Sequence, residues 1–411
     1  MAQPTLDLRL HAWLQLHLTP GVGPVSALRL LQALGSPEAI FQACAAQLHG
    51  LVSPTQAQAL ARPPATLADQ WARTQAWWAA EPTQRHLLCL HDAAYPAGLR
   101  ALPDPPPLLY VHGQLQRLAG PAVAVIGSRQ CSALGRHNAR HFAAGLSAAG
   151  RVVVSGLAIG IDGEAHEGAL GGAGGTVAVL GSGLDTVYPL RHQPLAQRII
   201  AEGALVSEFP LGTPPRPTHF PRRNRLIAGL CQGVLVVEAG LPSGSLITAQ
   251  FAADQGREVF AIPGDIHAPS VHGCHHLIQQ GAMLVQSVQD ILDALPAHPT
   301  LPPPEPPSSA LPSAAAPASA AVPTHGPGVG TPPPSARRSA KPSPPPPVAR
   351  LMPPGAHQVL AVLEAAPASV EQLSQHIGWP PATLHELLQE LALWGLVQRQ
   401  PNGQFQRIAH A

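Results

Sequence analysis

Three arginines lie within four residues of one another in this 411-residue chain. The stretch reads His219-Phe220-Pro221-Arg222-Arg223-Asn224-Arg225, and Arg216 adds a fourth positive charge just before it. No Asp or Glu occurs between Glu208 and Glu238, so no carboxylate within that interval can neutralise the cluster. A guanidinium group can hold a phosphate through two hydrogen bonds and can also stack on a flat ring. Arginines beside an aromatic residue therefore predict a site for a polyanion with flat faces, such as single-stranded nucleic acid.

The same residues allow plainer interpretations. A run of charges is often only a solvated surface, and Phe220 could fill a core instead of stacking on a base. Some of the arginines could brace the segment, and we expect Asn224 to do so. We read 219–225 as a loop, with a helix starting near Arg225, and expect the loop to contact nucleic acid.

The elements that would position this loop form an alternating pattern of strands and helices. Six short apolar runs are expected to be strands of a doubly wound, mostly parallel sheet: 123–126, 152–154, 176–180, 204–206, 234–237 and 259–262. Ligands of such sheets bind at the carboxyl ends of the strands, so the loops after these runs should share one rim. Gly127-Ser128-Arg129 follows the first run. We expect it to contact phosphate, because a helix N-terminus offers free N–H groups and Arg129 adds a cation.

The chain is expected to fold as four segments. Residues 1–85 read as a helical domain in which Gly21-Val22-Gly23 joins two helices like a helix-hairpin-helix module; DNA contact and an ordinary tight turn are both open there. Residues 86–295 hold the sheet. Residues 296–350 are dominated by Pro, Ala and Ser and predict a disordered tether. Residues 351–411 have the element order of a winged helix, with a ribbon turn at Asn402-Gly403.

Composition excludes several classes of protein. The single lysine, Lys341, lies in the Pro/Ala-rich tract, so no Walker A loop and no P-loop ATPase is possible in the folded segments. The five cysteines form no Cys-x-x-Cys pair, which argues against a disulfide framework or structural zinc and fits the cytoplasm. No signal peptide and no membrane span is expected. With a net charge of +1, any nucleic-acid binding must come from local clusters.

Other constellations are interpreted as structural. Asp162 and His166 lie four residues apart on one helix face, as an acid/base pair could, but we expect Asp162 to cap its helix. The third helix of the winged helix carries Glu386 and Glu390 without Arg or Lys, which favours protein contact or a structural role over reading of duplex DNA. Five residues could serve as zinc ligands: His267, His272, Cys274, His275 and His276. Histidine is abundant throughout the chain, however, and no metal is expected. The glycine spacings do not complete a dinucleotide fingerprint, so no cofactor is expected.

The central motifs together resemble one family. They occur in order along about 90–292: Gly127-Ser128-Arg129, Ser155-Gly156-Leu157-Ala158 with Gly160-Ile161-Asp162 and His166, Ala178-Val179-Leu180-Gly181 with Gly183-Leu184-Asp185 and Tyr188-Pro189, Ser207-Glu208-Phe209-Pro210, Phe220 through Leu230, Glu238-Ala239, and Ser243 through Ala249. This set is similar to the DprA/Smf family, the DNA-processing proteins of bacterial natural transformation.

The resemblance implies an extended Rossmann-like domain that binds single-stranded DNA, forms a homodimer and helps to load the RecA recombinase, without catalysis. It places three groups of residues at the DNA: Gly127, Ser128 and Arg129 at the first phosphate-binding turn; Phe220, Arg222, Arg223 and Arg225 in the DNA-contacting loop; Ser243, Gly244 and Ser245 in a neighbouring backbone-contact loop. His192 and His275 stand where the family frequently has Asn. Contacts that other members make through lysine cannot be transferred to this chain.

Two rival functions stay open. The first is a nucleotide-processing enzyme like the Rossmann-like nucleoside-monophosphate phosphoribohydrolases, whose Pro-Gly-Gly-x-Gly-Thr-x-x-Glu loop cradles phosphate and supplies an acid. The corresponding stretch here, 242–248, has no such glutamate. The second is a transcription factor acting through the winged helix, which the acidic third helix disfavours.

Overall fold

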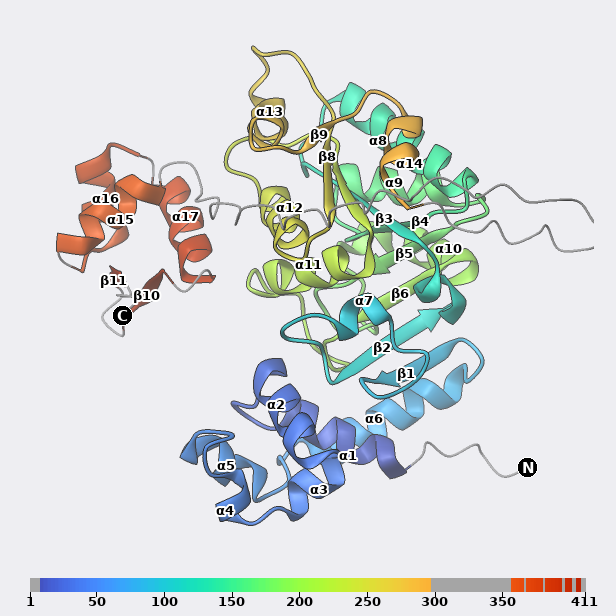
Figure 1. The fold of residues 1–411 in the computed structure, drawn as a ribbon, viewed down its shortest axis with the longest axis vertical. Coiled ribbons are helices and arrows are strands. Elements are labelled where there is room, and N and C mark those ends of the chain that lie inside the picture. The colour runs from blue at the N-terminus through green and yellow to red at the C-terminus, as the bar shows by residue number, and fades with distance from the viewer. Residues whose placement is uncertain are drawn as a thin grey trace, which may run out of the picture. The chain divides into compact units, whose positions relative to one another are not determined.

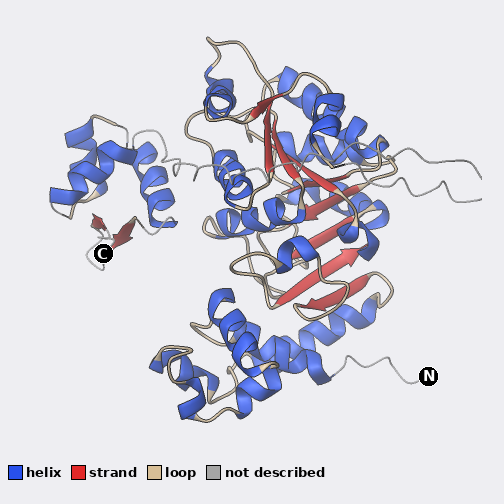
Figure 2. Ribbon diagram, in the orientation of Figure 1, coloured by secondary structure: helices blue, strands red, loops and turns tan. Residues whose placement is uncertain are grey.

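The computed structural model describes residues 8–296, 356–365, 367–379, 381–393, 396–400 and 404–407. Figure 1 shows the order of the elements, and Figure 2 shows one large twisted sheet with helices around it and a separate small sheet near the C-terminal end of the chain. Except for Pro296, the expected tether lies outside the described residues, and so does the expected ribbon turn at Asn402-Gly403.

The main sheet has nine strands in the order β1-β2-β6-β5-β4-β3-β7-β8-β9. Strands β3 to β9 pair in parallel, whereas β1 and β2 add an antiparallel edge beside β6. The strands are β1 (Arg85–Cys89), β2 (Leu108–Gly113), β3 (Ala122–Ile126), β4 (Val152–Ser155), β5 (Thr176–Val179), β6 (Ala204–Ser207), β7 (Gly233–Val236), β8 (Glu258–Ala261) and β9 (Met283–Leu284). The predicted doubly wound, mostly parallel sheet is confirmed: the six predicted runs correspond to β3 to β8. Strand β9 was not predicted.

The chain reverses its direction of travel through the sheet at β3. It moves outward from β3 through β4 and β5 to β6, and then crosses over to place β7 on the other side of β3. The loops that follow β3 and β7 are therefore neighbours at the topological switch point, where Rossmann-like folds usually bind their ligands.

Both faces of the sheet are buried, which explains why its strands are nearly continuous apolar runs. In β3, Ala122, Ala124 and Ile126 enter one core, and the alternating Val123 and Val125 enter the other. Helices whose buried residues join these two cores cover the two faces: α8 (Ala133–Ala148), α9 (Ile161–Ala169) and α14 (Val288–Ala294) on one, and α10 (Gln193–Glu202), α11 (His219–Leu230), α12 (Gly244–Asp254) and α13 (His272–Gln279) on the other. Short elements complete this part: α7 (Ala97–Arg100), η1 (Leu115–Ala119), η2 (Leu190–His192) and η3 (Pro269–Val271).

The expected N-terminal helical part is present. It contains α1 (Leu8–Leu18), α2 (Pro24–Leu34), α3 (Pro37–Gln42), α4 (Ala45–Leu48), α5 (Pro54–Leu60) and α6 (Leu67–Ala80). The turn between α1 and α2 is held from within the protein, because Gln56 Nε2 donates to the Gly21 carbonyl at 2.7 Å and to Ser26 Oγ at 3.1 Å. DNA contact at this hairpin stays a hypothesis.

The C-terminal part has the order of elements expected for a winged helix. Its helices are α15 (Ala356–Ala365), α16 (Val370–Ile377) and α17 (Pro381–Leu393), followed by β10 (Val397–Arg399) paired antiparallel with β11 (Phe405–Arg407). Ser369 caps α16 as predicted, since its side chain accepts the Gln372 N–H at 3.3 Å.

Candidate nucleic-acid interface

The arginine cluster lies in a helix and not in a loop. Helix α11 begins at His219, so the segment predicted to be a loop forms its first two turns. Proline is compatible with this position because the N–H groups of a first turn have no partner inside the helix. A helix separates the side chains of adjacent residues by about 100°, so neighbouring arginines must point in different directions.

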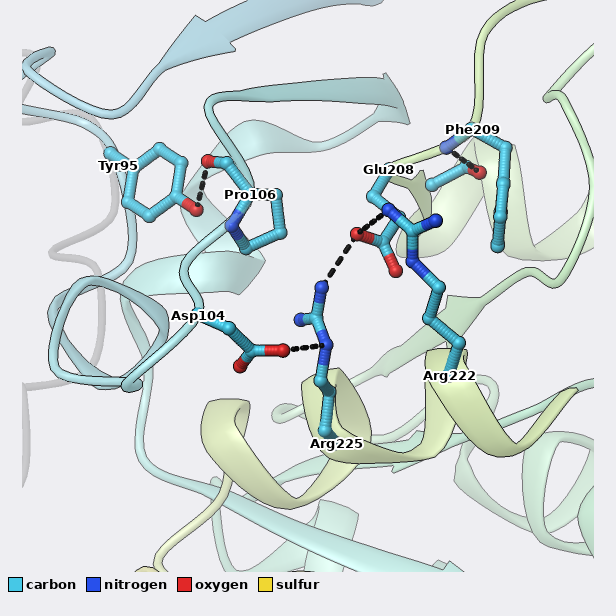
Figure 3. Close-up of polar contacts among 8 residues, drawn as sticks. Tyr95, Asp104, Pro106, Glu208, Phe209, Arg222 and Arg225 are labelled. Carbon is cyan, nitrogen blue, oxygen red and sulfur yellow. Dashed lines mark hydrogen bonds and ion pairs between the residues drawn. The ribbon is translucent and has the colours of Figure 1, made fainter. Parts of the chain in front are cut away.

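Arg225 points into the protein, and only 6% of its side chain is exposed. Its Nη2 donates to Glu208 Oε2 at 2.7 Å, and its Nε lies 2.9 Å from Asp104 Oδ2. Figure 3 shows the guanidinium between these two carboxylates. The expectation that Arg225 contacts DNA is thus wrong for this conformation: Glu208 and Asp104 take up its charge and leave it inaccessible.

Arg223 is also buried, on a different side of the helix. Its Nη1 donates to the Gly156 carbonyl at 2.7 Å and also to the Val179 carbonyl. Burial lowers the pKa of Arg223 to about 10, which still leaves the side chain charged at neutral pH. Arg223 therefore ties the loop after β4 to the end of β5, and its predicted DNA contact is corrected in the same way.

Arg222 is the one member of the three that reaches the surface, with 44% of its side chain exposed. Its Nη2 lies 3.2 Å from Glu208 Oε2, and its Cζ lies 5.3 Å from the centre of the Phe209 ring. His219 stacks on the same ring, with 4.3 Å between centroids. Glu208 and Phe209 therefore hold Arg222 in place from one side, and its exposed donors can reach a phosphate.

A second group joins the turn after β3 to the start of α11. The Cζ of Arg129 lies 5.2 Å from the centre of the Phe220 ring, and Tyr188 lies 5.8 Å from it on the loop after β5. Phe220 is half-buried, whereas Arg129 and Tyr188 are exposed. The structure thus brings together Arg129 and Phe220, two predicted site residues that are 91 positions apart in the sequence.

The backbone at the switch point is already occupied by a carboxylate of the protein. Glu238, which is buried just after β7, accepts the Ser132 N–H at 3.1 Å and the Ser132 hydroxyl at 2.7 Å. Ser132 is the N-cap of α8, so Glu238 lies where a phosphate would meet the helix N-terminus. The Ser128 N–H donates to the Glu238 carbonyl at 2.7 Å. Glu238 therefore takes up the Ser128 and Ser132 N–H groups, two of the donors in this segment, and the predicted phosphate contact of Gly127-Ser128-Arg129 stays a prediction.

The third predicted group lies at the start of α12. Ser243 is the N-cap of this helix, and its hydroxyl accepts the Ser245 N–H at 3.3 Å. Gly244 is exposed. The group follows β7, which is the neighbour of β3, so the topology places it at the same rim as Arg129. Its contact with DNA stays a prediction.

Asp162 and His166 support the loop after β4. Asp162 accepts the Gly156 N–H at 3.1 Å, and His166 Nε2 accepts the Leu157 N–H at 3.3 Å. Leu157 needs this support because its φ of 57° is unusual for a residue with a side chain. The predicted helix cap is corrected: the N-cap of α9 is Gly160, and Asp162 instead serves the preceding loop. Burial raises the pKa of Asp162 and lowers that of His166 to about 3.

Two arginines and one tyrosine that are exposed on the segments after β5 and β6 were not among the predicted site residues. Tyr188 and Arg191 follow β5, and Arg216, noted only as an extra charge, lies in the segment before α11; all three are exposed. A signal existed, since Tyr188 and Arg191 stand in a loop at the predicted rim. Their exposure depends on packing and cannot be read from the sequence.

The histidine-rich segment after β8 is tied by its own hydrogen bonds. His275 Nε2 lies 3.1 Å from the Gly264 carbonyl oxygen, and His272 Nε2 lies 3.1 Å from that of Ile266. Within the residues that the structure describes, no group of three or more His, Cys, Asp or Glu is placed to hold a metal ion. In the same residues no helix is both long and apolar enough to cross a lipid bilayer.

Fold and site define a class: a Rossmann-like protein whose carboxyl rim carries exposed arginines and an aromatic pair, with a carboxylate at the place of the usual phosphate cradle. A family model described as DNA recombination-mediator protein A matches residues 86–296, and one described as DprA winged helix domain matches residues 339–403. The chain belongs to this DNA recombination-mediator family, DprA/Smf.

Similar proteins come from several bacteria. The chain is 50% identical to Protein Smf of Escherichia coli (strain K12) over 219 residues, which are 53% of this chain and 58% of that protein. It is 49% identical to DNA processing protein DprA of Streptococcus pneumoniae over 201 residues, 49% of this chain and 71% of the relative. The X-ray structure of DprA from Streptococcus pneumoniae aligns with a TM-score of 0.57 and 38% identity, covering 72% of this chain and all of that one.

Proposed function

We propose that the chain binds single-stranded DNA along the carboxyl rim of its sheet and acts as a recombination mediator. The observation that carries this proposal is a set of four exposed arginines and one aromatic pair on the segments that follow β3, β5 and β6, which we call the rim surface: Arg129, Tyr188, Arg191, Arg216, Phe220 and Arg222. Apart from the Arg222–Glu208 pair, no ion pair to these arginines is found among the described residues.

The rim surface suits an unpaired strand better than a duplex. Arginines bind phosphates without regard to sequence, and an exposed ring needs a base whose face is open. In a duplex those faces are stacked and unavailable. Membership in a family described as recombination mediators supports the same substrate class.

Binding of DNA without catalysis is consistent with the structural roles of the buried ionisable groups near the rim. Asp162 and His166 are buried and hydrogen-bonded to the loop after β4. Glu238 holds the helix N-terminus at which a nucleotide phosphate would be expected. A nucleotide-processing enzyme, the rival function, would release the base from AMP, so robust release of adenine by the purified chain would favour that rival.

We extend the proposal to partners. A second copy would pair along β9, an edge strand whose Met283 and Leu284 have 41% and 43% of their surface exposed. Leu284→Arg should then convert a dimer into a monomer in light scattering, and an unchanged mass would contradict this.

We propose that the bound strand is handed to RecA in the cytoplasm during natural transformation. Faster RecA filament formation on single-stranded DNA when the chain is added would support that step.

The test of DNA binding compares single- and double-stranded oligonucleotides on the full chain. Charge reversal of Arg129 and Arg222 together should reduce single-strand affinity by at least tenfold, because both groups are exposed at the rim. Arg62→Glu is the matched control, since Arg62 is an exposed arginine of the N-terminal helical part. Equal affinity for the double variant and the control, with both folded, would refute the proposed interface. A parallel titration with 86–295 tests whether this segment is the DNA-binding domain.

A further inference from the structure

Tyr188 offers the open aromatic face of the rim surface. Among the Phe, Tyr and Trp residues whose exposure the structure describes, it is the only exposed one, with 48% of its surface accessible. A ring exposed to this extent in a loop contributes little to the core. Its position after β5 places it beside the α11 residues that face the rim.

Phe220, by contrast, is already in contact on several sides. The guanidinium of Arg129 lies over its ring, Tyr188 lies beside it with a tilt of 41°, and Gly181 backs it so closely that an added Cβ would lie 3.1 Å from Phe220 Cδ1. A base inserted between Tyr188 and Phe220 would need a separation of about 7 Å, twice the best carbon–carbon contact distance. The observed 5.8 Å is too short, so a base must stack on the outer face of Tyr188.

The charges around Tyr188 would hold the backbone of the same strand. Arg191 is exposed three residues further along the chain, in η2, and the exposed Arg129 has its guanidinium over the ring of Phe220. A base on Tyr188 would thus have cations within reach of the phosphates that flank it. Asp185, three residues before Tyr188, accepts the Gly212 N–H at 2.8 Å, so its carboxylate is held at the loop after β6.

We propose that Tyr188 is the base-stacking residue of the rim surface, and that Phe220 is a support that orients Tyr188 and Arg129. This inference rests on the proposed function, because the ligand is a base of the bound single strand. Stacking through a ring face accepts any base, so Tyr188 would add affinity without sequence preference.

The experiment measures binding of the full chain to a labelled oligonucleotide of mixed sequence and to an abasic strand of the same length. Tyr188→Ala should weaken binding to the normal strand by roughly 5- to 150-fold. Tyr188→Phe keeps the ring and should bind as the unmodified chain does. On the abasic strand, which has phosphates but no bases, Tyr188→Ala and the unmodified chain should bind equally. The salt dependence should be unchanged in Tyr188→Ala, whereas Arg191→Gln should reduce the slope by about 0.7.

Each of the following outcomes would contradict a specific part of the proposal. A loss on the abasic strand as large as on the normal strand would mean that Tyr188 acts only by placing Arg129. An equal loss in Tyr188→Phe and Tyr188→Ala would assign the effect to the hydroxyl instead of the ring. If charge reversal at Arg129 and Arg222 abolishes binding while Tyr188→Ala has no effect, this inference fails and the proposed function stands. If none of these variants changes affinity, the proposed function fails as well.

Discussion

The three arginines of α11 have the same chemistry but different surroundings. Arg223 donates to two backbone carbonyls and Arg225 pairs with two carboxylates, both inside the protein. Arg222 shares Glu208 with Arg225 but remains 44% exposed. A surface ion pair contributes little to stability, whereas a buried one is costly to break. Substitution of a buried arginine should therefore mainly lower stability, and substitution of Arg222 should mainly weaken binding.

We predict that Arg225→Met lowers the free energy of unfolding by about 3 kcal/mol or more, since Glu208, whose side chain is fully buried, loses one of its two cations. Arg222→Met should cost less than about 1 kcal/mol and should instead weaken binding of single-stranded DNA. Urea denaturation and a binding titration on both variants measure the two effects. Equal destabilisation by the two substitutions would contradict the assignment.

His166 makes stability depend on pH. Its Nε2 accepts the Leu157 N–H, so the ring hydrogen is on Nδ1, which donates to Thr176 Oγ1 at 2.7 Å. Burial lowers the pKa of His166 to about 3. Below pH 6.5 the unfolded chain takes up a proton that the folded chain does not, so stability falls as the pH falls from 6.5 towards 3. The slope from this residue is about 1.4 kcal/mol per pH unit at most.

We expect His166→Gln to flatten this slope, because glutamine does not titrate. Melting temperatures between pH 4.5 and 7.5 provide the measurement. His141→Gln, at an exposed position of α8, is the control and should leave the slope as it is. A slope that is the same in all three proteins would place the titrating group elsewhere.

At the scale of elements, the start of α8 separates this protein from nucleotide-binding relatives of the fold. A helix N-terminus at the switch point of a doubly wound sheet is a ready site for phosphate. Here Glu238, from the end of β7, reaches across and accepts from Ser132. The carboxylate takes the position that an anion would occupy at this helix N-terminus.

Removal of this carboxylate should reveal the latent anion site. We predict that Glu238→Ala destabilises the protein by about 1–3 kcal/mol, because the hydrogen bonds that the Ser132 N–H and hydroxyl donate to a charged acceptor are lost. Phosphate should then raise the melting temperature of the variant relative to chloride at equal ionic strength. Glu167→Ala, which breaks only the exposed pair with Arg198, is the control. An equal response to phosphate in the control and the variant would count against this reading of Glu238.

At the scale of the whole molecule, the small number of cations on the rim surface limits the electrostatic part of binding. The chain carries a net charge of only +1, and the rim surface contributes four arginines. Each phosphate contact to a single strand adds about 0.7 to the salt slope. We therefore predict a slope of log affinity against log salt no steeper than about −3, measured between 50 and 300 mM NaCl. A markedly steeper slope would show that cations outside the rim surface take part.

Much of the fold could be predicted because its causes are local. The apolar run 123–126 and the Gly-Ser turn after it predict a strand and a loop from neighbouring residues alone, and the structure has β3 there. The two-residue β9 was missed because its pairing with β8 depends on a segment about twenty residues away. The run 219–225 was read as a loop because its charges and proline hide the buried face of α11, which continues through Leu226 and Ile227.

The sequence by itself determined the alternation of strands and helices, the loops at one rim, and the use of arginine as the cation of the folded segments. Only the tertiary structure decided which arginines face the solvent, because the acceptors for Arg223 lie 67 and 44 residues away and Asp104 lies 121 residues from Arg225 (225 − 104). It also decided that Tyr188 and Phe220 meet. Burial results from the packing of remote segments, and no spacing within one segment encodes it.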